Sequence, residues 1–103
     1  MADRLEQLRK LHQTDPQDPF VTYGIAMEHC KRNEHEEALR WLDQTLTLDK
    51  HYCYAYFQKG RILSETSQTE DAVTALRAGM QAAQEAGDDH AHTEIAQLLE
   101  EVG

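Results

Sequence analysis

The chain has 103 residues, of which 40% are hydrophobic and 28% are charged, so it is long enough for one folded domain and too apolar to be disordered. Asp and Glu number 19 against 10 Lys and Arg, and the net charge of −9 repels phosphate backbones, which argues against a nucleic-acid partner. The N-terminus has no long apolar core and nowhere do about 18 apolar residues run together, so we expect no secretion signal, no membrane span and a cytoplasmic protein.

Every segment between the turns is predicted to be helical, because apolar residues recur at spacings of three and four and no alternating strand pattern occurs. Residues 1–17 are predicted to form one helix. Residues 18–51 and residues 52–86 are each predicted to form a hairpin of two helices, and residues 87–103 a C-terminal capping helix. The sequence therefore predicts a single all-α domain.

Two joints carry clear helix-capping signals. Asp18 and Pro19 supply a cap and a first-turn proline for the helix that follows them. Gly87 is expected to end one helix in the left-handed conformation, and Asp88 or Asp89 to cap the next helix.

The two hairpins are related by a period of 34 residues. Asn33-x-x-Glu36 and Ser67-x-x-Glu70 each resemble a capping box that opens a helix, and they lie 34 residues apart. A fixed period of this length is typical of stacked helical repeats. The same shift superimposes Ala38 on Ala72, Leu39 on Val73 and Leu42 on Leu76.

With this period, nearly the whole sequence resembles the tetratricopeptide repeat family, whose frame has an aromatic-x2-Leu-Gly-x2-Tyr motif, then Ala-x3-aromatic, then Pro. The first copy has Thr22, Ile25, Ala26, His29, Ala38, Leu42 and Lys50 at these sites, and the second has Tyr56, Lys59, Gly60, Leu63, Ala72, Leu76 and Gln84. Thr22 and His29 replace aromatic residues of the family, and Lys59 replaces a leucine. The resemblance implies an α-α superhelix of about six helices, with two full hairpins and a half repeat at each end.

Small residues are expected where the helix backbones come closest together. Ala26, Ala38, Gly60 and Ala72 occupy such sites in the repeat frame. Gly79 lies inside a predicted helix, where glycine costs about 1 kcal/mol relative to alanine, so we expect a close helix crossing there.

The resemblance further implies that the first helix of each hairpin lines a concave groove that takes extended peptides. On these helices one continuous face lies beside the packing positions, and it presents aromatic residues and methionine for apolar contact and polar residues for peptide carbonyls or a carboxylate. The equivalent face of the last helix is acidic. The predicted groove residues are Phe20, Tyr23, Met27, Lys31, Tyr54, Phe57, Gln58 and Arg61.

Two alternatives concern individual groove residues. Any single aromatic among them would instead only seal the packing between helices. Family members that clamp the C-terminal carboxylate of heat-shock chaperones use Lys and Asn residues where this chain has Tyr23, Met27 and Gln58, so a chaperone clamp is not expected.

Catalysis and metal binding are not expected, and we predict no cofactor. The sequence has no glycine-rich phosphate loop or nucleophile elbow, and its histidines lack the paired spacing of a metal site. His29 and His35 are interpreted as packing residues. Cys30 and Cys53 are expected to be reduced thiols.

The sequence therefore predicts a non-catalytic protein-interaction module that binds an extended segment of a partner protein or peptide. The alternative is a structural, self-associating unit, a homodimer formed through Leu98, Leu99 and Val102 of the last helix.

Overall fold

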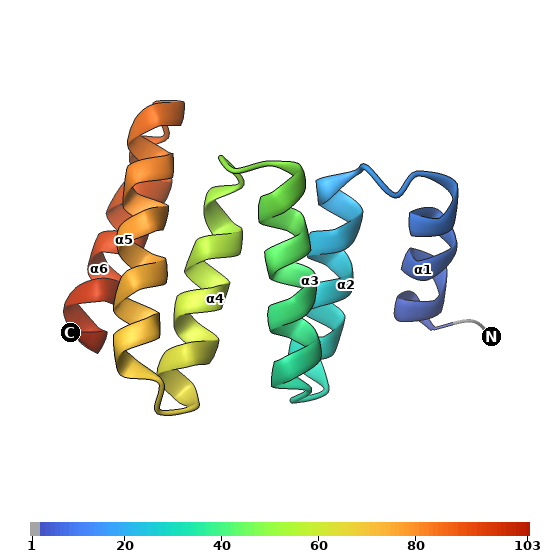
Figure 1. Ribbon diagram of the computed structural model, residues 1–103, viewed down its shortest axis with the longest axis horizontal. Helices are drawn as coiled ribbons and strands as arrows, with labels where there is room; N and C mark the ends of the chain where they lie inside the picture. Colours follow the sequence, from blue (N-terminus) through green and yellow to red (C-terminus); the bar gives the residue numbers. More distant parts are fainter. Residues whose placement is uncertain (1–2) are drawn as a thin grey trace. The chain divides into compact units, whose positions relative to one another are not determined.

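The computed structural model describes residues 3–103, which form six α-helices and no strand (Figure 1). The helices are α1 (Arg4–Thr14), α2 (Pro19–Lys31), α3 (His35–Leu48), α4 (Cys53–Glu65), α5 (Thr69–Ala86) and α6 (Asp89–Val102). The predicted all-α class is confirmed. The chain divides into two compact units, Met1–Asp49 with α1 to α3 and Lys50–Gly103 with α4 to α6.

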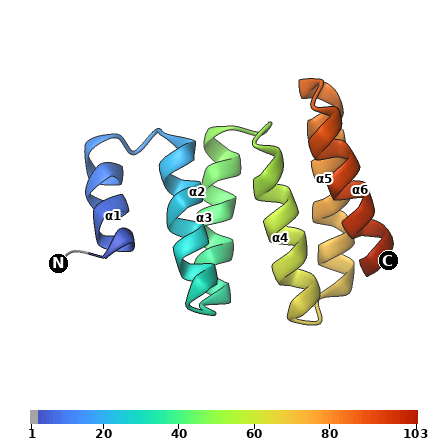
Figure 2. The same cartoon turned by 180° about the vertical axis from the view of Figure 1, so that it is seen from behind.

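In the first unit, α2 packs against both α1 and α3 (Figure 2). Leu5 and Leu8 of α1 are buried against Val21 and Ile25 of α2, and Trp41 of α3 covers this cluster. Each fully buried aliphatic side chain contributes roughly 1.5–3 kcal/mol to folding. Leu5 and Leu8 are three residues apart and so share one face of α1, and burying this face against α2 holds the two helices together.

A buried pair of hydroxyl groups joins α2 to α3. Thr22 and Thr45 are both 0% exposed, and their Oγ1 atoms are 2.7 Å apart. The Thr45 hydroxyl also donates a hydrogen bond to the carbonyl oxygen of Trp41 at 2.8 Å. Thr22 stands where the repeat frame has an aromatic residue, and its hydroxyl has a partner in the core, as a buried polar group requires.

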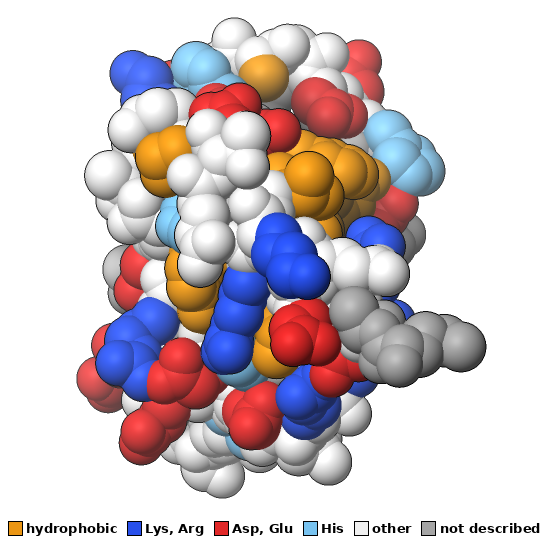
Figure 3. All heavy atoms as spheres, turned by 90° about the vertical axis from the view of Figure 1, so that its right-hand side faces the viewer, with side chains coloured by type: hydrophobic (Ala, Val, Ile, Leu, Met, Phe, Trp, Pro, Cys, Tyr) orange, Lys and Arg blue, Asp and Glu red, His pale blue; other side chains and the backbone are white. Residues whose placement is uncertain are grey.

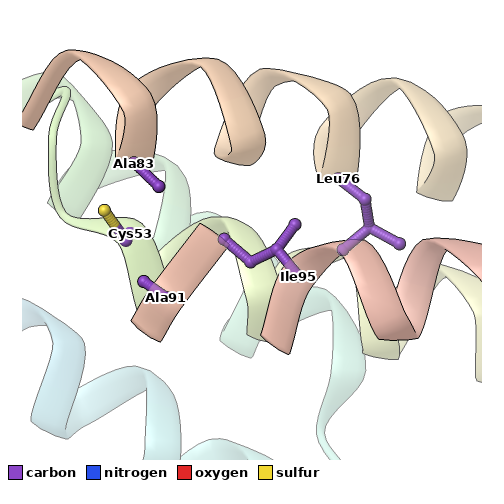
Figure 4. Close-up of a cluster of buried hydrophobic side chains, with 5 residues drawn as sticks. All are labelled: Cys53, Leu76, Ala83, Ala91 and Ile95. Atoms are coloured by element: carbon purple, nitrogen blue, oxygen red, sulfur yellow. The ribbon is translucent and has the colours of Figure 1, made fainter. Parts of the chain in front are cut away.

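The second unit has its own core, shared by three helices. Cys53 of α4, Leu76 and Ala83 of α5, and Ala91 and Ile95 of α6 form a buried cluster (Figure 4). Partly buried side chains surround this cluster, namely Tyr54, Phe57, Met80, Leu98, Leu99 and Val102.

Two glycines allow close helix contacts in the second unit, as predicted. A Cβ atom at Gly60 would lie 2.5 Å from Cγ of Leu76, and one at Gly79 would lie 2.6 Å from Cβ of Tyr56 and 3.2 Å from Cδ1 of Ile95. Carbon atoms in van der Waals contact are about 3.5–4.0 Å apart, so neither site has room for a side chain.

The caps at two joints agree with the prediction. The Asp18 carboxylate accepts a hydrogen bond from the Phe20 amide at 3.0 Å, with Pro19 in the first turn of α2. Asp88 caps α6 in the same way, accepting from the Ala91 amide at 3.0 Å. A charged acceptor satisfies an amide that has no partner inside the helix.

The two predicted capping boxes are wrong. Asn33 and Ser67 have φ angles of 57° and 63°, so they end the preceding helices in the left-handed conformation, as Gly87 does at 69°. After Asn33, the Glu34 amide donates to the carbonyl of His29 at 3.0 Å, the bond that closes a helix ended by a left-handed residue. Asn33 and Ser67, which were predicted to begin α3 and α5, therefore end α2 and α4 instead. Neither α3 nor α5 has a side-chain cap.

The helix joints nearest the predicted repeat boundaries are residues 15–18, 49–52 and 87–88. The predicted repeat boundaries at 17/18, 51/52 and 86/87 stay a prediction, as does the assignment of residues 1–103 to one domain. No helix within residues 3–103 combines the length and apolar character needed to cross a bilayer.

Candidate binding surfaces

The predicted binding residues of α2 lie together on one side of that helix. Residues three and four apart on a helix share a face, so Phe20, Tyr23, Met27 and Lys31 line a common shallow pocket in the first unit, with a volume of about 260 Å³. Phe20 is 66% exposed. Viewed from the α1 side, hydrophobic side chains reach the surface between charged ones (Figure 3).

Charged groups also line the α2 pocket. The Glu28 carboxylate, whose side chain is only 12% exposed, lies 3.1 Å from Nζ of Lys31 and 3.7 Å from Nε of Arg4. Lys31 is predicted to hold a peptide group, and in the structure its ammonium group also pairs with Glu28. Sequence reasoning missed Arg4 and Glu28, although the spacing of three between Glu28 and Lys31 is typical of a helix ion pair.

On α4 the predicted aromatic residues contact each other. The rings of Tyr54 and Phe57 have centroids 6.3 Å apart and are inclined by 62°, an edge-to-face geometry. The Tyr54 hydroxyl donates to Oε1 of Glu94 on α6 at 3.3 Å. Desolvation, followed by the charge of Glu94, raises the pKa of Tyr54, so the hydroxyl keeps its proton and remains a donor.

The predicted polar residues of α4 bind each other. Nε of Arg61 donates to Oε1 of Gln58 at 2.9 Å, and its Nη1 donates to Oε1 of Glu65 at 2.9 Å. The Arg61 side chain is 36% exposed. A ligand carboxylate would therefore have to compete with Glu65 for the guanidinium group.

The structure adds a pocket between α4 and α6 in the second unit. It is lined by Phe57 of α4 and by Glu94, Gln97, Leu98 and Glu101 of α6, and its volume is about 260 Å³. The sequence indicated an acidic face on the last helix. It did not indicate that Phe57 and Leu98 would form apolar walls beside these carboxylates.

A further pocket lies beside Trp41, the only tryptophan of the chain. The ring of His12 meets that of Trp41 edge to face, with centroids 5.0 Å apart, and Glu37, Arg40 and Gln44 complete the lining. Sequence reasoning did not select this site. The only feature of the sequence that could have indicated this pocket is Trp41. A tryptophan alone does not distinguish a binding site from a packing role, and Trp41 also covers the apolar cluster of the first unit.

The histidines and cysteines have structural surroundings. His29 is 3% exposed, and its Nδ1 lies 2.9 Å from Oε1 of Glu34, which fits the predicted packing role. Within residues 3–103, Cys30 and Cys53 form no disulfide. Within residues 3–103, no three His, Cys, Asp or Glu side chains gather in a way that could hold a metal ion.

No protein-family model and no curated protein matches this chain. Among solved structures, a tetratricopeptide repeat domain protein from Salinibacter ruber is 27% identical in its solution structure, with 85% of this chain and 89% of that chain covered and a TM-score of 0.79. A crystal structure of a tetratricopeptide repeat domain protein from the same organism is 26% identical, with coverages of 82% and 94% and a TM-score of 0.77. The TPR2B domain of yeast Sti1, in a complex with pHsp70, shares the fold at 18% identity, with coverages of 95% and 78% and a TM-score of 0.89.

The chain has the tetratricopeptide repeat fold and is similar to tetratricopeptide repeat domain proteins. This confirms the resemblance seen in the sequence. The tetratricopeptide repeat frame also accounts for the burial on α2, where Thr22, Ile25 and Ala26 are 0% exposed and His29 is 3% exposed. The predicted binding residues of α2 lie beside these packing positions. That one groove joins the α2 and α4 residues stays a prediction.

Proposed function

We propose that this tetratricopeptide repeat protein is a non-catalytic interaction module whose α2 pocket binds an extended segment of a partner protein. The exposure of Phe20 beside Tyr23 and Met27 carries the proposal. Burying a phenylalanine side chain is worth roughly 1.5–3 kcal/mol, so covering the exposed part of Phe20 would stabilise a complex. Aromatic residues and methionine are also enriched in protein interfaces.

The proposal extends to α4, where the partner also contacts Tyr54 and Phe57. Their edge-to-face contact and the hydrogen bond from Tyr54 to Glu94 hold the two rings in place before binding. Side chains that are already ordered lose less conformational entropy when a partner binds. The complex of the Sti1 domain with pHsp70 supports a protein or peptide as the class of partner.

A peptide library tests the proposal. Binders selected with the wild-type chain are measured by fluorescence anisotropy against Phe20→Ser, with Leu11→Ser as the matched control. Leu11 is the other large hydrophobic residue exposed within residues 3–103, at 54%, and it does not line the α2 pocket. We expect Phe20→Ser to weaken binding by about tenfold, since about 1.4 kcal/mol corresponds to a factor of ten. Equal affinities of the two variants would refute a role for the α2 pocket.

Self-association is the alternative function, and the structure gives it less support. Leu98, Leu99 and Val102 are partly buried against the core of the second unit, so only part of their apolar area remains for contact with a second copy. Sedimentation equilibrium of the wild-type chain distinguishes the two functions. A stable dimer that no longer binds the selected peptides would favour self-association.

A further inference from the structure

The pocket between α4 and α6 combines apolar walls with acidic groups. Phe57 and Leu98 both pack against the buried cluster of the second unit, which fixes their positions. Glu94 and Glu101 line the same pocket, with Leu98 between them on α6. Residues seven apart on a helix share a face and are separated by about 10.5 Å along its axis, so the pocket has a carboxylate toward each end.

The negative charge of this pocket is largely unpaired. Within residues 3–103, no Lys, Arg or His side chain forms an ion pair with Glu101. Glu94 has His90 and the Tyr54 hydroxyl as neighbours, and both leave its carboxylate in the pocket. The nearby cation of α4, Arg61, is held by Gln58 and Glu65. A ligand that enters this pocket therefore gains most if it brings a positive charge.

Arginine has the side chain that matches this set of groups. Its flat guanidinium group can stack on the ring of Phe57 while its N–H groups donate to Glu101, and its methylene stem can contact Leu98. Guanidinium is also less strongly hydrated than the ammonium group of lysine, so it enters a partly apolar site more readily. A carboxylate ligand would be repelled by both glutamates.

We propose that this pocket, here called the α4–α6 pocket, binds an arginine side chain of the partner protein. The inference rests on the proposed function, because it names a residue of the partner segment. It assigns to Glu101 the role of ion-pair partner and to Phe57 the role of stacking surface. The α2 pocket does not share this chemistry, because Lys31 and Arg4 already pair with Glu28 there.

The test uses a short probe that does not need the α2 pocket. The ¹⁵N-labelled chain is titrated with the peptide Ac-Ala-Leu-Arg-Leu-Ala-NH2 and with the same peptide carrying citrulline, which keeps the shape of arginine without its charge. We expect amide shifts around Phe57, Leu98 and Glu101, and an affinity about tenfold higher for the arginine peptide. Equal affinities for the two peptides would overturn the inference.

Two substitutions separate a specific site from general attraction by an acidic protein. Glu101→Gln should abolish the preference for arginine over citrulline, whereas Glu70→Gln, which removes the same charge from an exposed site on α5, should preserve it. Equal losses in both variants would show non-specific attraction and overturn the inference.

The outcomes for the two proposals are distinguishable. If Phe20→Ser weakens binding of the selected peptides while the arginine preference is absent, the inference fails and the proposed function stands. If the arginine peptide binds in the α4–α6 pocket while Phe20→Ser has no effect, the α2 proposal fails instead.

Discussion

Replacing Gly60 with alanine tests how tightly α4 and α5 are packed. The added Cβ atom would lie 2.5 Å from Cγ and 3.1 Å from Cδ1 of Leu76, well inside van der Waals contact. Leu76 is 0% exposed and belongs to the buried cluster of the second unit, so it has no free space into which to move. The helices must therefore separate or Leu76 must adopt a strained rotamer.

The magnitude follows from two opposing terms. Overpacking a core costs about 1–3 kcal/mol, and the overlap at Gly60 is large enough to place this substitution near the upper value. Alanine regains about 1 kcal/mol of helix propensity relative to glycine. We expect a net loss of about 2 kcal/mol in the free energy of unfolding. Gly60→Leu adds three further carbon atoms and is expected to prevent folding of the unit.

Urea denaturation followed by circular dichroism measures the loss, with Gly24→Ala as the matched control. A Cβ atom at Gly24 would lie 3.3 Å from the two terminal methyl groups of Leu8, which need to move only slightly. Gly24→Ala is therefore expected to change the free energy of unfolding by less than about 1 kcal/mol. In a Leu76→Ala background, Gly60→Ala should no longer destabilise. Equal stabilities for Gly60→Ala and wild type would refute the packing argument.

Three further predictions concern local interactions. Ser67→Gly should stabilise the chain by about 0.5–1 kcal/mol, because the left-handed conformation strains a residue with a side chain. For the same reason Gly87→Ala should destabilise the chain by about 1 kcal/mol. Melting temperatures that change in the opposite directions would contradict this. Thr22→Val should cost about 1 kcal/mol, because it removes the hydrogen bond between the two buried hydroxyl groups and leaves Thr45 with only the Trp41 carbonyl as a partner. The double variant with Thr45→Val should be at least as stable as the single one, since the partly satisfied hydroxyl is then removed as well; a double variant less stable than the single one in urea denaturation would exclude this account. A helix amide and an arginine lower the pKa of the Asp3 carboxyl below its usual 3.8, so its contribution to holding α1 is complete above pH 3.8 and is lost as the pH falls through the lowered value. Asp3→Asn keeps the cap but cannot titrate, so NMR signals of the α1 amides should change less on acidification than in the wild type, and identical changes would argue against this role.

The fold was predictable because equivalent small and apolar residues recur in the sequence at a fixed spacing of 34 positions. Ala38 and Ala72 are both fully buried, as the 34-residue period requires. The capping boxes were wrong because Asn33 and Ser67 suit two roles, a helix start and a left-handed helix end. The length of the joint, which sequence spacing alone does not fix, decides between these roles.

The α2 surface was also predictable, since its residues belong to one helix and follow its periodicity. Its charged side was not, because Arg4 comes from a different helix and reaches Glu28 only after α1 has packed. The α4–α6 pocket was missed for a similar reason. Phe57 and Leu98 are 41 positions apart in the chain, and only the packing of α4 against α6 brings them together.

The threonine pair in the first unit also has a consequence for the alignment of α2 with α3. Two apolar side chains tolerate a small slide, because one methyl contact can replace another. Two hydroxyl groups do not, since a shift of one residue advances a helix by about 1.5 Å and turns it by about 100°, which would carry the Thr22 hydroxyl away from that of Thr45 and break their 2.7 Å contact. In this repeat, the position that usually holds an aromatic ring holds a polar contact. This contact therefore selects one alignment of α2 with α3 among several that would bury a similar apolar area.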